Sequence, residues 1–372
     1  LDWWRTPAEI TSGHHIRDHM GVPDGWHDAR GMPVHQRTFA YAHSDLPLED
    51  YSTELISRQA VRYIETRDEQ PFLLWLSYPD PHAPWEAPQS YVDRIFAEGF
   101  ELPPTDAQEF SPARGLPIPE RLRVLKQIYD LDGIDEKEVR NLYATYLAQI
   151  RFIDDGIGRL LDCLERTNRI DNTIVVFCSD HGDFMVEHGM SEKGGAMYDC
   201  LTHVPLVVSA PGAPGEGTRC SKLVSLLDVV PTLLDLAGVA PMEKAQGVLL
   251  PVVTGGVGRE AIFSEYGAGG PTFTLAELNA MPDTYGRRAG RATTPVREAE
   301  GLLKMVRTRE WKYVHDAPAG VHQLYDLARD PWERTNLADS PAHARVISEM
   351  RGLLLDWHLQ RDRREPFRER HD

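Results

Sequence analysis

The sequence predicts an α/β protein in which a mainly parallel sheet lies between helices and a small antiparallel sheet with one helix follows. Short apolar runs, of the kind found in buried strands, alternate with segments whose apolar residues recur every three or four positions. After residue 254 this alternation stops. We therefore divide the 372 residues into a large domain over residues 1–254 and a small subdomain over residues 255–372.

The large domain is predicted from elements that alternate along the chain. We expect helices at 52–64, 91–98, 135–167 and 228–238, and strands at 71–78, 171–180 and 204–209. The first two strands are continuous apolar runs, which predicts that both of their faces are covered. Because strands alternate with helices, parallel pairing is favoured. Before residue 50 no periodicity is sustained, and the five histidines between His14 and His35 fit loop or surface positions better than a metal site.

The subdomain is predicted from short elements near the end of the chain. Residues 255–297 are rich in Gly, Pro and Thr and show no regular pattern. Two short strands follow at 302–308 and 311–314, with a third at 323–327. An amphipathic helix at 343–361 closes the chain. This order predicts a small antiparallel sheet covered by one helix.

Composition excludes several classes of protein. Forty Lys and Arg against 57 Asp and Glu give a net charge of −17, which argues against a nucleic-acid partner. No apolar run is long enough to span a membrane, so no membrane partner is expected. The four cysteines show no CxxC or CxxxC spacing, which argues against a disulfide scaffold or a zinc cluster. They favour a reducing, cytoplasmic compartment, while a periplasmic or secreted location and any oligomeric state stay open.

The chemistry-bearing residues follow predicted strands. Asp180 and His181 stand side by side at the end of one strand, and Gly182 lets the chain turn there. Together an oxygen donor and a nitrogen donor suit a divalent cation. The alternative is a capping aspartate and a hydrogen-bonded core histidine.

Two further side chains could act beside such a cation. Lys193 lies in a polar, flexible, glycine-flanked segment, where its ammonium could neutralise an anion or could be an ordinary surface lysine. His82 follows the strand at 71–78 between Pro81 and Pro84, where it could be a packed loop histidine. If the two strands are parallel neighbours, His82 and Asp180 emerge at the same edge of the sheet.

Four segments in the same order resemble the sulfatase family within the alkaline-phosphatase-like superfamily. They are PFLLWLSYPDPHAPW at 71–85, the metal-and-lysine segment at 179–208, VSLLDVVPTLLDLAGV at 224–239 and LYDLARDPWERTNLAD at 324–339. The resemblance runs from about residue 50 to the C-terminus. It implies the alkaline-phosphatase-like fold and hydrolysis of sulfate esters of small molecules or glycans.

The resemblance also implies roles for single residues. Asp180 and His181 would be two ligands of a divalent metal, which is usually calcium, with magnesium or manganese as alternatives. Lys193 would contact the sulfate and the departing oxygen, and His82 would hydrogen-bond the leaving-group side. His203 lies where many relatives carry a basic residue, and core packing is its expected role here.

One family feature is missing from the sequence. The family's nucleophile is a formylglycine made from Cys or Ser in a C/S-x-P-x-R motif near the N-terminus, after two acidic metal ligands. None of the four cysteines is followed by x-P-x-R, and Thr293–Arg297 mimics the spacing with Thr and in the wrong order. We therefore expect the nucleophile and the remaining ligands to lie outside this chain, and the 372 residues alone to turn over little substrate.

Three other functions stay in view. A phosphonate monoester or phosphodiester hydrolase is possible because the Asp-His pair also occurs in such members of the superfamily. A non-catalytic relative that binds anions or glycans is the second. A nucleotide-binding α/β enzyme is disfavoured, since no GxGxxG or GxxxxGK follows a predicted strand.

Overall fold

The computed structural model describes residues 41–361 except 84, 107–108, 111, 130, 216, 243–244, 268–301 and 317–319. The histidines at 14–35 and the segment Thr293–Arg297 lie outside the described residues. In the described ranges no helix has the length and apolar character needed to cross a bilayer. All four cysteines are free thiols.

A layer of three helices forms one side of the molecule. The long helix α6 (Glu136–Arg166) packs against α3 (Ser52–Thr66) and α4 (Gln89–Glu98). All three helices confirm the sequence predictions, with bounds that differ by at most two residues. Asp135 starts α6 by accepting a 2.8 Å hydrogen bond from the backbone N of Lys137, the usual arrangement of a capping aspartate. A Cβ at Gly156 would overlap the Ser57 hydroxyl, so α3 and α6 approach closely at this glycine.

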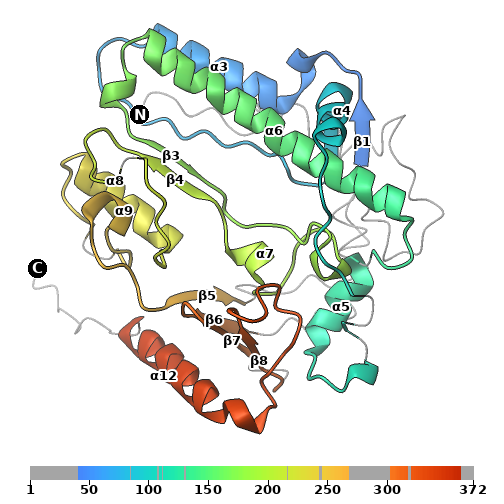
Figure 1. The fold of residues 1–372 in the computed structure, drawn as a ribbon. Helices are drawn as coiled ribbons and strands as arrows, with labels where there is room; N and C mark the ends of the chain where they lie inside the picture. Colours follow the sequence, from blue (N-terminus) through green and yellow to red (C-terminus); the bar gives the residue numbers. More distant parts are fainter. Residues whose placement is uncertain are drawn as a thin grey trace, which may run out of the picture.

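Two pairs of strands lie next to this layer. Strands β1 (Tyr41–Ser44) and β2 (Trp85–Pro88) are parallel, whereas β3 (Val175–Cys178) and β4 (Leu206–Ser209) are antiparallel. Strands at the positions of β3 and β4 are confirmed, but the parallel pairing expected for them is wrong. Residues 179–205 form a loop with one short helix, α7 (Asp199–Thr202), instead of a crossover helix, so β4 returns antiparallel. The β3–β4 pair crosses the middle of the molecule between α6 and the C-terminal sheet (Figure 1).

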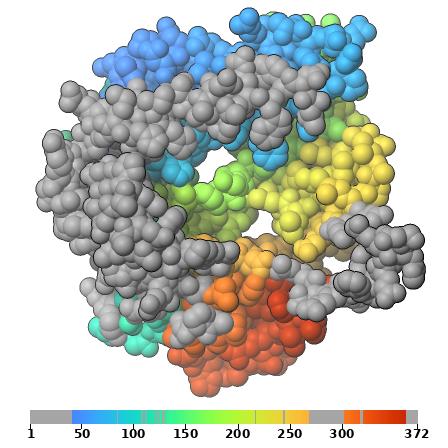
Figure 2. All heavy atoms as spheres, turned by 180° about the vertical axis from the view of Figure 1, so that it is seen from behind, coloured from blue at the N-terminus to red at the C-terminus, as the bar shows by residue number. Residues whose placement is uncertain are grey.

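The predicted strand at 71–78 is extended but joins no ladder among the described residues. Its side chains alternate: Leu74 and Leu76 pack against α3 and α6, while Leu73 and Trp75 are 81% and 85% exposed. Phe177 of β3 and its β4 partner Val207 are exposed as well. The expectation that these strands are covered on both faces is therefore wrong for the described residues. Seen from behind, an opening lies between blue, green and yellow parts of the chain (Figure 2).

The C-terminal sheet is antiparallel throughout, in the order β5 (Ile262–Tyr266), β6 (Leu303–Arg307), β7 (Trp311–Asp316) and β8 (Gln323–Asp326). Helix α12 (Ala344–Arg361) covers one face through Met350 and Leu354, which pack on Val306, Tyr313 and Leu324. The three predicted strands and the helix are confirmed. Strand β5 falls in a stretch for which no element was predicted. The boundary at residue 254 stays a prediction.

The remaining elements are short. Helix α8 (Val229–Leu236) confirms the helix predicted at 228–238 and ends before Gly238, whose φ of +66° suits glycine. Helices α5 (Glu120–Tyr129) and α9 (Pro251–Thr254) and strands β1 and β2 were not predicted. Single 3-10 turns occur at Leu48–Asp50, Pro112–Arg114, Ile170–Asn172, Glu187–Gly189, Leu226–Asp228 and Pro341–His343.

Candidate active site

Asp180 and His181 follow the end of β3 and bring two metal-type donors close together. The Asp180 Oδ2 atom lies 3.6 Å from His181 Nε2, and Asp180 Oδ1 accepts a 2.9 Å hydrogen bond from the His181 backbone N. The His181 Nδ1 atom lies 3.0 Å from the carbonyl oxygen of Gly182, which favours a proton on Nδ1 and a lone pair on Nε2. The Asp180 side chain is 85% exposed. The alternative of a buried core histidine is therefore wrong, because both side chains face outward.

Gly182 lets this turn pack closely against Cys200 and Leu201 of α7. Its backbone N donates a 2.9 Å hydrogen bond to the carbonyl oxygen of Leu201. A Cβ at Gly182 would overlap the carbonyl oxygen of Cys200, which is backbone and cannot swing aside. Glycine is required here for space, since the two segments pass closer than a side chain allows.

Lys193 is more enclosed than the sequence indicates. Its side chain is 25% exposed, yet its Nζ atom is buried and has no hydrogen-bond partner among the described residues. The Nζ atom lies 3.6 Å from Asp183 Oδ1 and 3.9 Å from Glu192 Oε2. A Cβ at Gly194 would overlap Leu125, so the segment is packed and the expected flexible surface loop is wrong.

Asp183 lies among three of the four predicted site residues. Burial raises its pKa above the usual value, while the charges of Lys193, His181 and His82 act in the opposite direction. Lys193, His181 and His82 thus all lie within electrostatic range of the Asp183 carboxylate. Asp183 was not among the residues predicted to form the site.

His82 is presented by a loop that α3 and α6 anchor. The carboxylate of Asp80 accepts a hydrogen bond from Thr53 of α3 and another, of 3.2 Å, from Gln149 of α6. The His82 backbone N donates to the carbonyl oxygen of Pro79 at 3.1 Å, and its Nδ1 lies 2.5 Å from the carbonyl oxygen of Ala83. The loop therefore has a defined conformation next to the helix layer.

The loop at 184–192 joins Asp183 to Lys193 and is almost wholly buried. The Phe184 N atom donates to the Glu192 carbonyl oxygen at 2.6 Å, and the Val186 N atom donates to that of Met190 at 3.0 Å. Val186 has a φ of +77°, which is strained for a β-branched residue. His188 lies 2.6 Å from Glu109 through its Nδ1 atom. Sequence reasoning missed this support because the contact joins residues 79 positions apart.

His203 lies on the surface. Its side chain is 75% exposed, and its Nδ1 atom is 4.0 Å from Asp199 Oδ2. The expectation that His203 packs in the core is therefore wrong.

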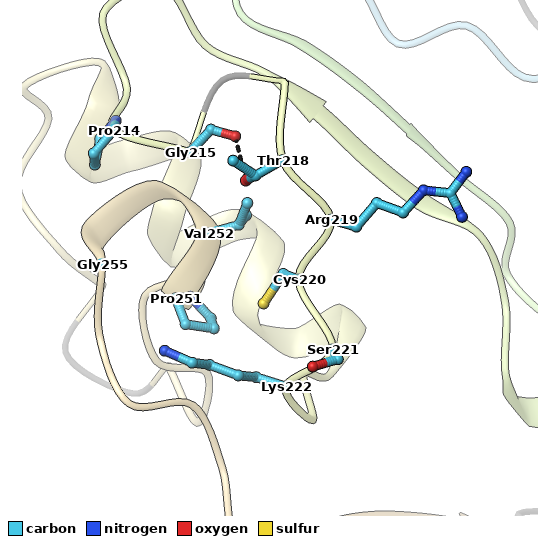
Figure 3. Close-up of a pocket in the computed structure, with 10 residues that line it drawn as sticks. All are labelled: Pro214, Gly215, Thr218, Arg219, Cys220, Ser221, Lys222, Pro251, Val252 and Gly255. Carbon is cyan, nitrogen blue, oxygen red and sulfur yellow. Dashed lines mark hydrogen bonds between the residues drawn. The ribbon is translucent and has the colours of Figure 1, made fainter.

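A separate cavity of about 290 Å³ lies between the loop at 214–222 and α9. Figure 3 shows the Cys220 thiol pointing into it and Arg219 pointing away. None of the predicted site residues lines this cavity.

The donors of Asp180 and His181 fit part of a divalent metal site. Asp180 supplies one oxygen and His181 one nitrogen. Because these two atoms are 3.6 Å apart, a single cation can contact both at a distance of about 2.3–2.6 Å, the usual length of a calcium–oxygen bond. Within the described ranges, no group of three or more His, Cys, Asp or Glu side chains could hold a metal ion. The two residues fit half of a site and would need further ligands.

Comparison with known proteins identifies the family. The sulfatase family model matches residues 12–239. The choline-sulfatase of Rhizobium meliloti is 32% identical over 294 residues, covering 76% of this chain and 49% of that protein. The multifunctional alkaline phosphatase superfamily protein PehA of Trinickia caryophylli is 27% identical over 355 residues, covering 92% of this chain and 65% of that protein.

Solved structures agree with these relatives. The phosphonate monoester hydrolase of Agrobacterium radiobacter superposes with a TM-score of 0.70 at 26% identity, covering 86% of this chain and 63% of that chain. The α/β, alkaline-phosphatase-like fold is thereby confirmed. This chain spans about half to two thirds of the length of the curated relatives it matches. On the match over residues 12–239, the chain belongs to the sulfatase family.

Proposed function

We propose that this chain carries the metal-binding and leaving-group side of a hydrolase that cleaves sulfate monoesters with a divalent metal. The observation that carries the proposal is the buried Lys193 ammonium, which has no hydrogen-bond partner among the described residues. Buried donors normally make hydrogen bonds, and the carboxylates of Asp183 and Glu192 contact this ammonium only as ion pairs of 3.6 and 3.9 Å. Its N–H groups beside a turn with metal-type ligands therefore suit an anionic ligand. A sulfate group supplies both the negative charge and the acceptor oxygens.

The chemistry needs positive charge where the ester oxygen departs. Cleavage of the sulfate ester places negative charge on that oxygen, and fixed donors lower the barrier when they point at it. Lys193 would donate to the sulfate and to the departing oxygen, because its ammonium is fixed by a packed backbone. His82 would hydrogen-bond the leaving-group side from its anchored loop, and a protonated imidazole could deliver a proton there.

Asp180 and His181 would hold the divalent metal, which acts as a Lewis acid on a sulfate oxygen when bound. We propose calcium, with magnesium and manganese as alternatives, because an exposed carboxylate and a flexible ligand number suit calcium. The formylglycine nucleophile belongs to the same proposal and is expected from a C/S-x-P-x-R motif outside this chain.

The proposed substrates are sulfate esters of small molecules or glycans. Relatives named choline-sulfatase and Delta 4,5-hexuronate-2-O-sulfatase support this class, at 32% and 28% identity. A phosphonate monoester hydrolase is the second candidate, favoured by the Agrobacterium structure at 26% identity and by the Asp180–His181 pair.

Turnover of two chromogenic substrates separates these candidates. The protein expressed from its complete gene is assayed on p-nitrophenyl sulfate and p-nitrophenyl phenylphosphonate, with calcium and after chelation. We expect chelation-sensitive turnover with a higher kcat/KM on the sulfate, and a loss of about 100-fold or more in kcat/KM for Lys193→Ala. Lys304→Ala, which removes an exposed partner of Glu265, is the matched control. A higher kcat/KM on the phosphonate would favour the second candidate.

Binding to the 372-residue chain tests the same site without turnover. Calorimetry with sodium sulfate and with calcium chloride should show binding of sulfate that Lys193→Ala weakens and binding of calcium that Asp180→Asn weakens. We expect little hydrolysis by this chain alone. Calcium-dependent hydrolysis at an ordinary enzymatic rate by the 372 residues would contradict that expectation.

A further inference from the structure

Asp183 has no role in the proposed function, although it lies next to Lys193, which that function uses. Its side chain is 9% exposed, and its Oδ1 atom is 3.6 Å from the Nζ atom of Lys193. His181 and His82 are its other electrostatic neighbours.

The backbone fixes Asp183 and Lys193 relative to each other. The residues next to them, Phe184 and Glu192, share the 2.6 Å hydrogen bond that closes the loop at 184–192. Phe184 and Met190 of this loop are fully buried, so the two ends cannot separate without breaking core contacts. The distance between the carboxylate and the ammonium is therefore set by the fold and not by the two side chains alone.

This distance suits a counter-ion that leaves the lysine donors available. At 3.6 Å the two charges attract each other, but the separation exceeds the usual length of an N–H···O hydrogen bond. A buried ammonium with no negative neighbour would be costly. Asp183 can therefore stabilise the charged lysine while its N–H groups stay free for an anionic ligand.

We propose that Asp183 is the positioning residue that holds the Lys193 ammonium in place for the sulfate group of the substrate. The inference rests on the proposed function, since it concerns the same site. Glu192 is the competing carboxylate, with Oε2 3.9 Å from the same nitrogen, and it serves as the matched control.

Acylation rates of single lysines test this role without turnover. The chain is treated with an acetylating N-hydroxysuccinimide ester, and the labelling of each lysine is followed by peptide mass spectrometry. In Asp183→Asn the Lys193 side chain loses its counter-ion and reaches solvent, so we expect about tenfold faster labelling. Lys304, which is partly exposed, reports on the reagent, and fully buried Lys312 reports on the integrity of the fold.

The variants separate positioning from general structural damage. Glu192→Gln should change Lys193 labelling less than Asp183→Asn does, and Asp183→Glu should restore slow labelling because it returns the charge. Unchanged Lys193 labelling in Asp183→Asn with Lys312 still protected would overturn the proposal, as would equal effects of Asp183→Asn and Glu192→Gln. If Asp183→Asn exposes Lys312, Asp183→Glu decides: slow Lys193 labelling supports the proposal, and fast labelling in a folded protein overturns it.

Affinity for inorganic sulfate gives a second readout. Asp183→Asn should raise the sulfate Kd about tenfold, and Asp183→Glu should recover most of that loss. If the complete protein hydrolyses no sulfate ester, the proposed function fails, while the labelling of Lys193 still decides the role of Asp183.

Discussion

The Lys312 ammonium of β7 lies 2.5 Å from the carboxylate of Asp199. Asp199 begins α7 and stands six residues after Lys193 in the chain. Lys312 is fully buried, and its Nζ atom also contacts Glu333 at 2.7 Å and the carbonyl oxygen of Met197 at 3.0 Å. Burial acts to raise the pKa of Asp199, but Lys312 and Arg307 hold it below its usual value. One buried ion cluster thus joins the C-terminal sheet to the segment that carries the site lysine.

Removing the central cation should destabilise this junction. Lys312→Met leaves Asp199 and Glu333 buried without their main partner, so we expect a loss of about 3–5 kcal/mol in the free energy of unfolding. Urea denaturation followed by circular dichroism measures it. Lys304→Met breaks only the exposed pair with Glu265 and should cost less than about 1 kcal/mol. Equal losses in the two variants would show that the buried cluster is not a stabilising junction.

Gly182→Ala should displace the Asp180–His181 turn. The added methyl group meets the carbonyl oxygen of Cys200, so the turn must move or the fold must loosen, at a cost of about 1–3 kcal/mol. We expect a lower Tm and weaker calcium binding by calorimetry. Gly158→Ala in α6 meets no atom within 4 Å and should instead stabilise the helix by about 0.5–1 kcal/mol. Unchanged calcium affinity in Gly182→Ala would mean that the turn is not held by this contact.

The C-terminal sheet should lose stability in acid through His322. Burial, followed by the neighbouring His315 and Arg351, lowers the pKa of His322 to about 4 from 6.5. The unfolded chain therefore takes up this proton first as pH falls. The contribution of neutral His322 to the free energy of unfolding is complete above pH 6.5 and is lost as pH falls towards 4. Urea midpoints between pH 7 and 4 should fall less steeply for His322→Gln than for the wild-type chain. Parallel slopes would contradict this assignment.

Glu187 should act in the opposite direction. Burial raises its pKa from 4.5 to about 7, so the folded chain holds this proton more tightly than the unfolded chain. Stability is therefore lost as pH rises from 4.5 through 7. Glu187→Gln should raise the urea midpoint at pH 8 and leave it nearly unchanged at pH 4. A variant that is less stable than the wild-type chain at pH 8 would contradict this. It would show that the ionised Glu187 carboxylate makes an interaction whose stabilising free energy exceeds the cost of burying the charge.

Local pattern predicted most elements because their signals are short-range. The period of apolar residues in α6 lies within the helix itself, and the apolar runs of β3 and β4 are equally local. The direction in which β3 and β4 pair depends on the path of residues 179–205, which periodicity does not encode. Strand β2, with the sequence WEAP, was missed because its proline and acid are atypical of strands.

The candidate site was predicted in part. Asp180, His181, Lys193 and His82 were predicted from their positions after strands and from family resemblance, and their roles stay predictions; three of them lie within electrostatic range of Asp183. Asp183 itself and the support of the loop at 184–192 by Glu109 were missed. The contact between His188 and Glu109 spans 79 residues, and no local pattern signals such a pairing.

The fluorescence of Trp75 reports on the exposed side of the segment at 71–78. Its indole is 85% exposed, whereas Trp85 is fully buried. Because the chain has eight tryptophans, the emission of Trp75 is obtained as the difference between the wild-type chain and Trp75→Phe. Water around Trp75 shifts its emission to longer wavelengths and makes it accessible to quenchers such as iodide. Any polypeptide that settles over Leu73, Trp75 and Val207 should shift this emission to shorter wavelengths and protect it from iodide. Assembly on this side can thus be followed without a label.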